Sequence, residues 1–330
     1  MREAAFVKLN NKKWEALESA LTTQRQTDPD ALAAYFVQLT DDLAYAQTHY
    51  PNSSTTRYLN NLATKVHQNI YRNKKEEQSR FITFWKYELP RLMYETRKQL
   101  LYAFLIFSIS ILVGVISAAH DDTFVRLILG DAYVNMTLEN IKKGDPMGVY
   151  KSMGSSDMFF AITFNNIRVS FFAFIYGLFF SIGTGLLLFY NGIMLGAFQY
   201  FFYQKGLLLT SFLTIWIHGT LEISAIVIAG AAGLVMGNSF LFPGTFTRLE
   251  SFKRGAKKGL KIVIGLVPIF IMAGFLESFI TRLTELHWSI KLGIILISAF
   301  FILYYFVIYP IKLNRHERNA EDHITATKRL

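Results

Sequence analysis

Residues 169–204 read VSFFAFIYGLFFSIGTGLLLFYNGIMLGAFQYFFYQ, a run of 36 positions without a formal charge. An α-helix rises about 1.5 Å per residue, so about 20 apolar residues cross the roughly 30 Å hydrocarbon core of a bilayer. The run is therefore too long for one crossing. It contains the turn signal Tyr190-Asn191-Gly192, and we interpret it as two successive membrane spans, 169–189 and 192–203.

Four other stretches have the same apolar character. Two contain no formal charge, one contains a single acid, and one is interrupted only by His218 and Glu222. The composition agrees, because only 18% of the 330 residues are charged and 52% are hydrophobic, whereas a soluble domain carries roughly 25% charged residues. The sequence predicts an all-α polytopic membrane protein with six spans, the other four being 99–119, 207–237, 262–281 and 292–311.

The distribution of basic residues predicts the orientation, since Lys and Arg collect on the cytoplasmic side. Residues 238–261 hold six basic residues and one acid, whereas residues 120–157 hold four basic residues and six acids. Six spans place the basic segment and both termini in the cytoplasm. The alternative is a re-entrant hairpin at 193–217 with four spans, which would place the most basic segment outside. We expect six spans in the bacterial inner membrane.

Segments on either side of the spans look water-exposed. Apolar residues at helical spacing predict a cytoplasmic three-helix bundle at 1–75 and an amphipathic helix at 76–98 that lies against membrane lipids. A plain amphipathic connector fits the second pattern as well. We divide the remainder into a transmembrane domain, 99–311, with an outer helical loop at 120–157 and an inner basic loop at 238–261, and a cytoplasmic tail, 312–330.

Glu222 is the residue that most needs an explanation, because an ionised carboxylate in mid-membrane costs at least about 2.5 kcal/mol. His218, Glu222, Ala225, Ala229 and Gly233 recur at helical spacing on one face. Small residues let another helix approach closely, so we expect Glu222 to point into a dry helix–helix contact. In this interpretation, His218 and Glu222 form a buried hydrogen-bonded contact, a structural clip, that holds neighbouring helices in register. Alternatively, the pair is a proton-sensitive element or lines a substrate path.

Three further sets of residues are predicted to matter. Asn191, at the predicted break between spans, joins His218 and Glu222 in an intramembrane polar cluster. Asn165, Asn166 and Arg168, at the predicted outer end of a span, form a docking site for outside partners, or else Arg168 reaches to the interface. Helix packing is assigned to Gly177, Ser181, Gly185, Gly192, Gly196, Ala225, Ala229 and Gly233, the glycines on the second and third spans being candidate partners for the fourth.

Reactive constellations are missing from the sequence. The chain has no cysteine, which excludes thiol nucleophiles and Cys-ligated metals. His218-Gly219-Thr220-Leu221-Glu222 offers two ligands where a helical zinc motif supplies more, so we expect no metal, no cofactor and no catalytic residue. The sequence contains no stripe of basic residues with aromatic residues free to stack on bases, so we expect no nucleic-acid partner.

The sequence resembles the stage II sporulation protein M family of bacterial membrane proteins, in its longer form with a helical amino-terminal domain. The resemblance rests on Asn166-Ile167-Arg168-Val169, Gly183-Thr184-Gly185, Asn191-Gly192, His218 to Glu222, and Ala229 to Leu234. It implies a scaffold that anchors cell-wall-degrading partners and does no chemistry itself. We therefore expect a non-enzymatic, homo-oligomeric scaffold that holds other membrane or envelope proteins. The alternative is a transporter or lipid-handling protein with a polar site around His218 and Glu222.

Overall fold

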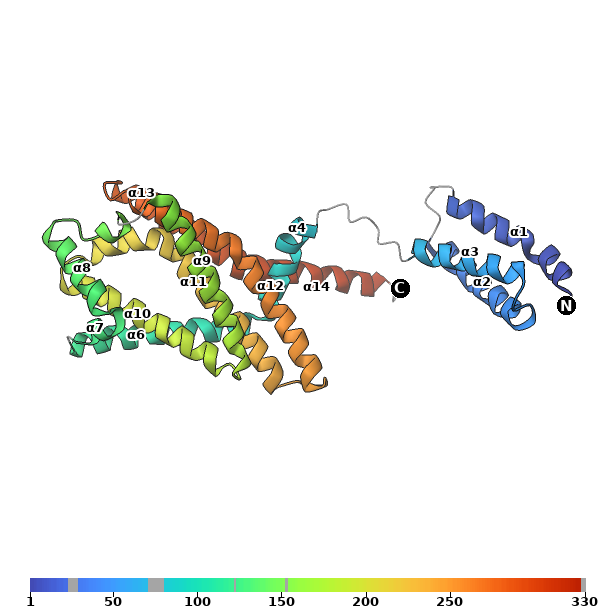
Figure 1. Cartoon of the computed structure of the whole chain (residues 1–330), viewed down its shortest axis with the longest axis horizontal. Coiled ribbons are helices and arrows are strands. Elements are labelled where there is room, and N and C mark those ends of the chain that lie inside the picture. The colour runs from blue at the N-terminus through green and yellow to red at the C-terminus, as the bar shows by residue number, and fades with distance from the viewer. Residues whose placement is uncertain (23–28, 71–79, 122, 152–153, 328–330) are drawn as a thin grey trace. The chain divides into compact units, whose positions relative to one another are not determined.

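The computed structural model describes residues 1–22, 29–70, 80–121, 123–151 and 154–327 (Figure 1). The chain divides into two compact units, Met1–Arg80 and Phe81–Leu330. Both units are helical, and the described ranges contain no strand, which confirms the predicted all-α fold.

The first unit is a three-helix domain. Its core contains Trp14, whose indole N–H donates a 2.9 Å hydrogen bond to Asp42 Oδ2, and Leu59, which has no exposed surface. The predicted boundary at residue 75 lies outside the described residues. The helices are α1 (Glu3–Thr22), α2 (Pro29–His49) and α3 (Ser54–Ile70).

The second unit contains six helical segments that are long and apolar enough to cross a membrane, so the predicted number of spans is confirmed. They are α6 (Arg97–His120), α9 (Ser155–Ile175) with a 3-10 turn to Leu178, α10 (Ile182–Gln204), α11 (Leu208–Leu241), α12 (Arg248–Phe275) with a π-helical segment to Thr281, and α13 (Trp288–Leu303), which continues through a π-helical segment (Tyr304–Ile308) into α14 (Tyr309–Thr327).

The predicted turn at Tyr190–Gly192 is wrong, and the boundaries of the two flanking spans move with it. The chain instead reverses at residues 179–181, where Phe180 and Ser181 adopt φ angles of 52° and 66°. Asn191 stays helical because its amide donates a 2.8 Å hydrogen bond to the carbonyl of Leu187, one turn earlier. The sequence gives no signal for this turn, because Phe180 and Ser181 adopt the left-handed backbone that is usually taken by glycine.

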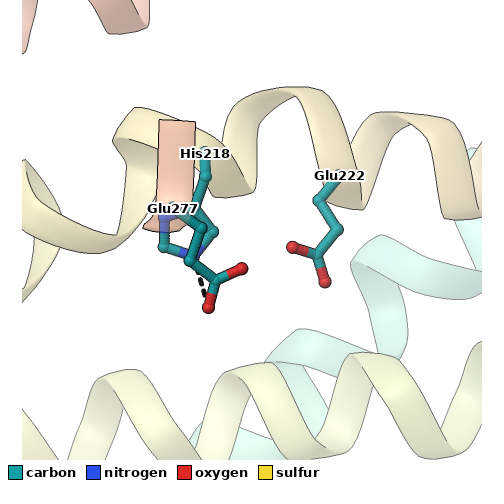
Figure 2. A group of neighbouring side chains, drawn as sticks. All are labelled: His218, Glu222 and Glu277. Atoms are coloured by element: carbon teal, nitrogen blue, oxygen red, sulfur yellow. Dashed lines mark ion pairs between the residues drawn. The ribbon is translucent and has the colours of Figure 1, made fainter. Parts of the chain in front are cut away.

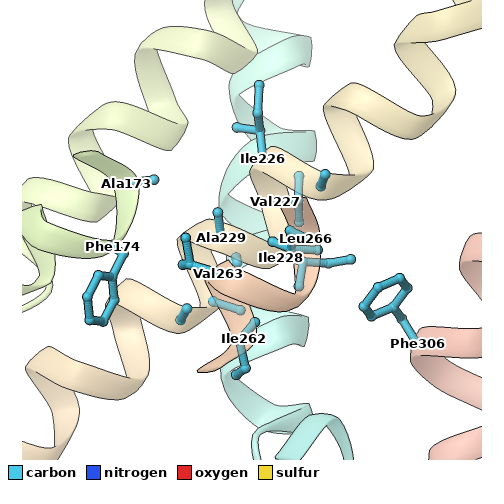
Figure 3. Close-up of a cluster of buried hydrophobic side chains, with 14 of the residues drawn as sticks. Ala173, Phe174, Ile226, Val227, Ile228, Ala229, Ile262, Val263, Leu266 and Phe306 are labelled. Atoms are coloured by element: carbon cyan, nitrogen blue, oxygen red, sulfur yellow. The ribbon is translucent and has the colours of Figure 1, made fainter. Parts of the chain in front are cut away.

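Helix α11 is the centre of the second unit. It packs against α6, α9, α10, α12 and α13. In its most apolar stretch of 18 residues, 83% of the residues are buried, whereas the corresponding share is at most 50% in the other five spans. Figure 3 shows Ile226 to Ala229 of α11 meeting Ile262, Val263 and Leu266 of α12, with Phe174 and Phe306 nearby. A polar side chain on α11 therefore faces protein or an internal cavity.

Small residues allow the closest helix contacts. A Cβ atom added to Gly177 would overlap the carbonyl oxygen of Gly233, and one added to Gly233 would overlap the Ala173 carbonyl oxygen and the Thr184 hydroxyl. These contacts join α11 to both sides of the reversal between α9 and α10. Ala225 and Ala229 are also fully buried on α11.

The remaining predicted packing residues differ in what they contact. Ser181 belongs to the reversal and packs against Gly237 of α11. Gly192 and Gly196 face α6 rather than α11, and Cβ atoms added there would collide with Ser110 and Ile111. Nothing lies within 4 Å of a Cβ placed on Gly185. Gly177, Ser181 and Gly185 do not form one stripe, because the reversal separates them.

The segment before the first span packs on protein. It comprises α4 (Arg80–Thr83), a π-helical segment (Phe84–Glu88) and α5 (Leu89–Glu95). Leu89 and Leu92 are buried, and α5 contacts both α12 and α14. The Tyr305 hydroxyl donates a 2.6 Å hydrogen bond to the Trp85 carbonyl. The apolar face that was predicted to lie on lipid is therefore covered by helices, at least from Leu89 onward.

Two short helices, α7 (Phe124–Leu129) and α8 (Asp131–Lys142), together with a 3-10 turn at Gly148–Lys151, cover one end of the bundle. Val125 and Val134 pack with Phe201, Phe202 and other residues near that end. These helices lie within the segment 120–157, whose position on the outer side stays a prediction, and α9 begins before the end of that segment, at Ser155.

Candidate functional site

Three ionisable side chains converge inside the membrane-spanning unit. His218 and Glu222 lie one turn apart on α11, and Glu277 comes from the π-helical segment Leu276–Thr281 that ends the fifth span. One ligand-type atom from each side chain lies within 4.8 Å of the others. Figure 2 shows the three groups facing a common space, with His218 Nε2 3.7 Å from Glu277 Oε1. The sequence prediction did not include Glu277 in this cluster.

The ring of His218 is oriented by Thr281. The distance from His218 Nδ1 to Thr281 Oγ1 is 3.0 Å, and the Thr281 hydroxyl donates its own hydrogen to the Leu276 carbonyl at 3.2 Å. In that arrangement the Thr281 oxygen accepts a hydrogen bond from His218, and the proton of a neutral imidazole lies on Nδ1. The lone pair on Nε2 then points toward Glu277.

The π-helical segment is the local feature that brings Glu277 and Thr281 to this place. A π-helical turn is wider than an α-helical turn and is frequent at functional sites. Here Ser278 and Thr281 are fully buried, while 13% of the Glu277 side chain remains exposed. The distortion therefore lets one short segment both orient the imidazole and present a carboxylate to it.

Glu222 and His218 line a cavity of about 390 Å³. A water molecule takes up about 30 Å³ in the liquid, so several waters or a small hydrated ion fit. Glu222 therefore lines a cavity between helices, whereas the sequence predicted a direct helix–helix contact. The wall carries polar side chains from four further elements, among them Asn165 and Asn166 of α9, Asn191 of α10, Tyr133 of α8 and Tyr150 of the 3-10 turn.

Asn165, Asn166 and Arg168 do not open their span. Asn166 lies eleven residues after the first residue of α9, about 16 Å along the helix and so near the middle of the span Ser155–Leu178. It is 5% exposed, and its side chain lies close enough to Glu222 to act on that carboxylate as a hydrogen-bond donor. Arg168 points away from the core with its guanidinium 5.3 Å from the Phe172 ring. Their docking role remains a prediction, but its premise of an outer position does not hold.

Two tyrosines close the cavity toward the end of the bundle that carries α7 and α8. The Tyr150 ring meets the His218 ring edge to face, with 5.7 Å between centroids. Burial raises the pKa of Tyr150 well above its usual range, and nearby Glu277 adds to the effect. Burial also raises the pKa of Tyr133 to about 12. Both phenols therefore stay protonated and present neutral hydroxyl groups.

The charges of this site are not balanced by the surrounding protein. None of the described side chains that line the cavity is a lysine or arginine. Among the described residues, Glu222 forms no ion pair. Glu277 is paired there with His218 alone, whose imidazole is charged only when it is protonated. Two carboxylates at this separation repel each other unless a proton or a cation lies between them.

Thr281, His218 and Glu277 are the residue types of a hydrolase triad, in which a hydroxyl nucleophile contacts a histidine base and an acid orients that base. Thr281 has no exposed surface, does not line the cavity, and gives its hydroxyl hydrogen to a carbonyl rather than to the imidazole. It therefore positions His218 and cannot attack a bound molecule.

The residues that sequence reasoning missed are Glu277, Thr281, Asn166 as a cavity residue, and Tyr150. One signal was available for Glu277, since it and Glu222 are the two acids on otherwise apolar spans. No sequence signal pairs them, because 55 residues separate them and only helix packing sets their distance.

Comparison with known proteins gives two matches. The family model for stage II sporulation protein M matches residues 103–282, more than half of the chain, and that for a domain of unknown function (DUF8413) matches residues 4–72. No curated protein and no solved structure matches. The first match extends from α6 to the end of the π-helical segment and so contains every cavity residue named above.

Proposed function

Because the chain belongs to the stage II sporulation protein M family, and the matched residues contain the whole His218–Glu222–Glu277 cluster, we propose that this cluster is the working site of the protein. The protein is a non-enzymatic, multi-pass membrane protein that binds a small cation in the cavity and passes it across the bilayer. It lies in the bacterial inner membrane with both termini in the cytoplasm.

The observation that carries this proposal is a pair of carboxylates that no described Lys or Arg compensates, Glu222 in the middle of the fourth span and Glu277 near the end of the fifth. A structural clip would have its charges matched by protein groups, because buried charges without partners are costly. Glu222 instead faces a cavity of about 390 Å³ whose described walls lack Lys and Arg. A mobile cation supplies the missing charge, and polar sites near the midplane are typical of membrane transporters.

Reconstituted vesicles test the proposal. Wild-type protein is expected to carry at least one cation of a panel of H⁺, Na⁺, K⁺, Mn²⁺ and Co²⁺, each followed with an entrapped indicator. Glu222→Gln removes one charge and keeps the shape, so the flux should fall at least 10-fold. Glu285→Gln, an exposed acid beyond the fifth span, is the matched control and should transport normally. Equal flux in wild type and Glu222→Gln, or no flux for the whole panel, contradicts the proposal.

A second role, that of a scaffold which holds other membrane or envelope proteins, is supported by a different observation. Met1–Arg80 is a compact unit with a core of its own, and the cavity lies entirely in the other unit. Such a domain is not needed to build an intramembrane site. We infer that it holds partner proteins, including further copies of the chain.

Crosslinking in native membranes examines this second role. The full chain is expected to yield crosslinked neighbours that a variant comprising residues 81–330 loses, while cation flux in vesicles is unchanged. If both forms capture the same neighbours, or neither captures any, the amino-terminal domain is no anchor.

A further inference from the structure

We propose that His218, Glu222 and Glu277 form a binding site for one divalent transition-metal ion. The inference rests on the proposed function, because it names the cation that the cavity takes. Each residue contributes one atom, namely Nε2 of His218 and one carboxylate oxygen from each glutamate.

The distances favour a shared ion over direct hydrogen bonding. At 3.7 Å, His218 Nε2 and Glu277 Oε1 are too far apart for a hydrogen bond. Two ligands of a tetrahedral ion with bonds of about 2.1 Å lie about 3.4 Å apart, which is close to this value. The largest separation in the cluster is below 4.8 Å, so Glu222 reaches the same ion after a shift of about 1 Å. Its cavity-facing side chain has room for that shift.

The imidazole is already in the form that a metal needs. Thr281 fixes the proton on Nδ1 and leaves the Nε2 lone pair directed at the carboxylates. Metal-binding histidines almost always donate their other ring N–H to an acceptor in this way. A histidine that only formed a salt bridge with Glu277 would instead be expected at hydrogen-bond distance.

Charge and donor type select the class of ion. One neutral imidazole and two carboxylates carry a total charge of −2, so a divalent ion makes the site neutral, whereas a monovalent ion leaves it charged inside the membrane. Mg²⁺ and Ca²⁺ prefer oxygen ligands alone. A mixed set of nitrogen and oxygen donors without thiolate suits Mn²⁺, Fe²⁺, Co²⁺ or Zn²⁺.

Asn166 supports the second ligand in a similar way. It lines the same cavity, is 5% exposed, and lies close enough to Glu222 to act on its carboxylate as a hydrogen-bond donor. Carboxylates that ligate metals are commonly held by such hydrogen bonds.

Titration with Co²⁺ alone tests the inference on full-length protein in detergent after treatment with a chelator. Wild type is expected to bind one Co²⁺ per chain, with the visible absorption of a low-coordinate site, and Zn²⁺ should displace it. His218→Ala, Glu222→Gln and Glu277→Gln should each weaken binding at least 100-fold. His120→Gln and Glu285→Gln, which alter exposed residues of the same types, should bind as wild type does.

Thr281→Val separates a metal site from loss of folding, because it removes the hydroxyl and keeps the shape. It should weaken binding by roughly 10- to 100-fold while the melting temperature of the metal-free protein stays close to that of wild type. Normal Co²⁺ affinity in the three ligand variants, or no Co²⁺ binding by wild type, overturns the inference. Stoichiometric Co²⁺ binding without flux of any cation in the panel supports the metal site and rejects transport. Flux of another cation that depends on Glu222, without Co²⁺ binding, supports transport and rejects the metal site.

Discussion

Replacing Gly233 by leucine is expected to prevent most of the protein from folding. A side chain at this position would overlap the backbone of Ala173 on α9 and the Thr184 side chain on α10. Gly177, in the 3-10 turn just before the reversal, also packs against Gly233. Backbone atoms in a packed bundle cannot move aside locally, so the helices must separate. We expect a loss of about 3 kcal/mol or more, at the upper end of the range for overpacked cores.

Size-exclusion chromatography and thermal unfolding in mild detergent measure this effect. The Gly233→Leu variant should give little monodisperse protein, and that fraction should melt well below wild type. Gly185→Leu is the matched control on α10, since nothing lies within 4 Å of its Cβ position, and it should melt within a few degrees of wild type. Similar behaviour of the two variants, whether both fold or both fail, would show that the contact with α11 is not what holds α9 and α10 in place.

Glu277→Met is expected to raise the melting temperature of the metal-free protein and to abolish ligand binding. Replacing a buried charge that lacks full compensation by an apolar side chain of similar volume often stabilises a protein by about 1 to 4 kcal/mol. For a unit of this size, that is a rise of about 3 to 10 °C. Sites that bind ligands commonly carry such a stability cost.

The sign of this shift distinguishes the two roles that the sequence leaves open for the polar residues. If His218, Glu222 and Glu277 were a structural clip, Glu277→Met would lower the melting temperature. Unfolding is followed in the presence of a chelator, so that bound ions do not stabilise wild type. Glu95→Met, which removes an exposed partner of Lys258, should change the melting temperature by no more than about 2 °C, because surface ion pairs contribute little.

Several features followed from the sequence because they depend on local pattern. The free energy of placing a helix in lipid depends on about 20 consecutive side chains, so the number of spans could be counted. The spacing of His218 and Glu222 puts both on one helix face, whatever surrounds them. The same reasoning gave the three helices of the first unit.

The misplaced reversal illustrates where local pattern stops. Asn191-Gly192 carries a stronger turn signal than Phe180-Ser181, yet the chain turns at the latter. Gly192 is used instead for close approach of α6, and Asn191 satisfies its amide within the helix. Tertiary packing thus overrode the turn preference, and this moved Asn166 from a predicted helix end to the middle of a span.

The sequence by itself determined that this protein is a six-span helical membrane protein with a helical amino-terminal domain and with a histidine and an acid one turn apart inside the fourth span. Only the tertiary structure decided that Glu277 joins them, that Thr281 orients the imidazole, and that a cavity lies in front of His218 and Glu222. The physical reason is that hydropathy and helical period are properties of neighbouring residues. The meeting of side chains from α9, α11 and the end of α12 depends instead on how closely glycine and alanine let those helices approach.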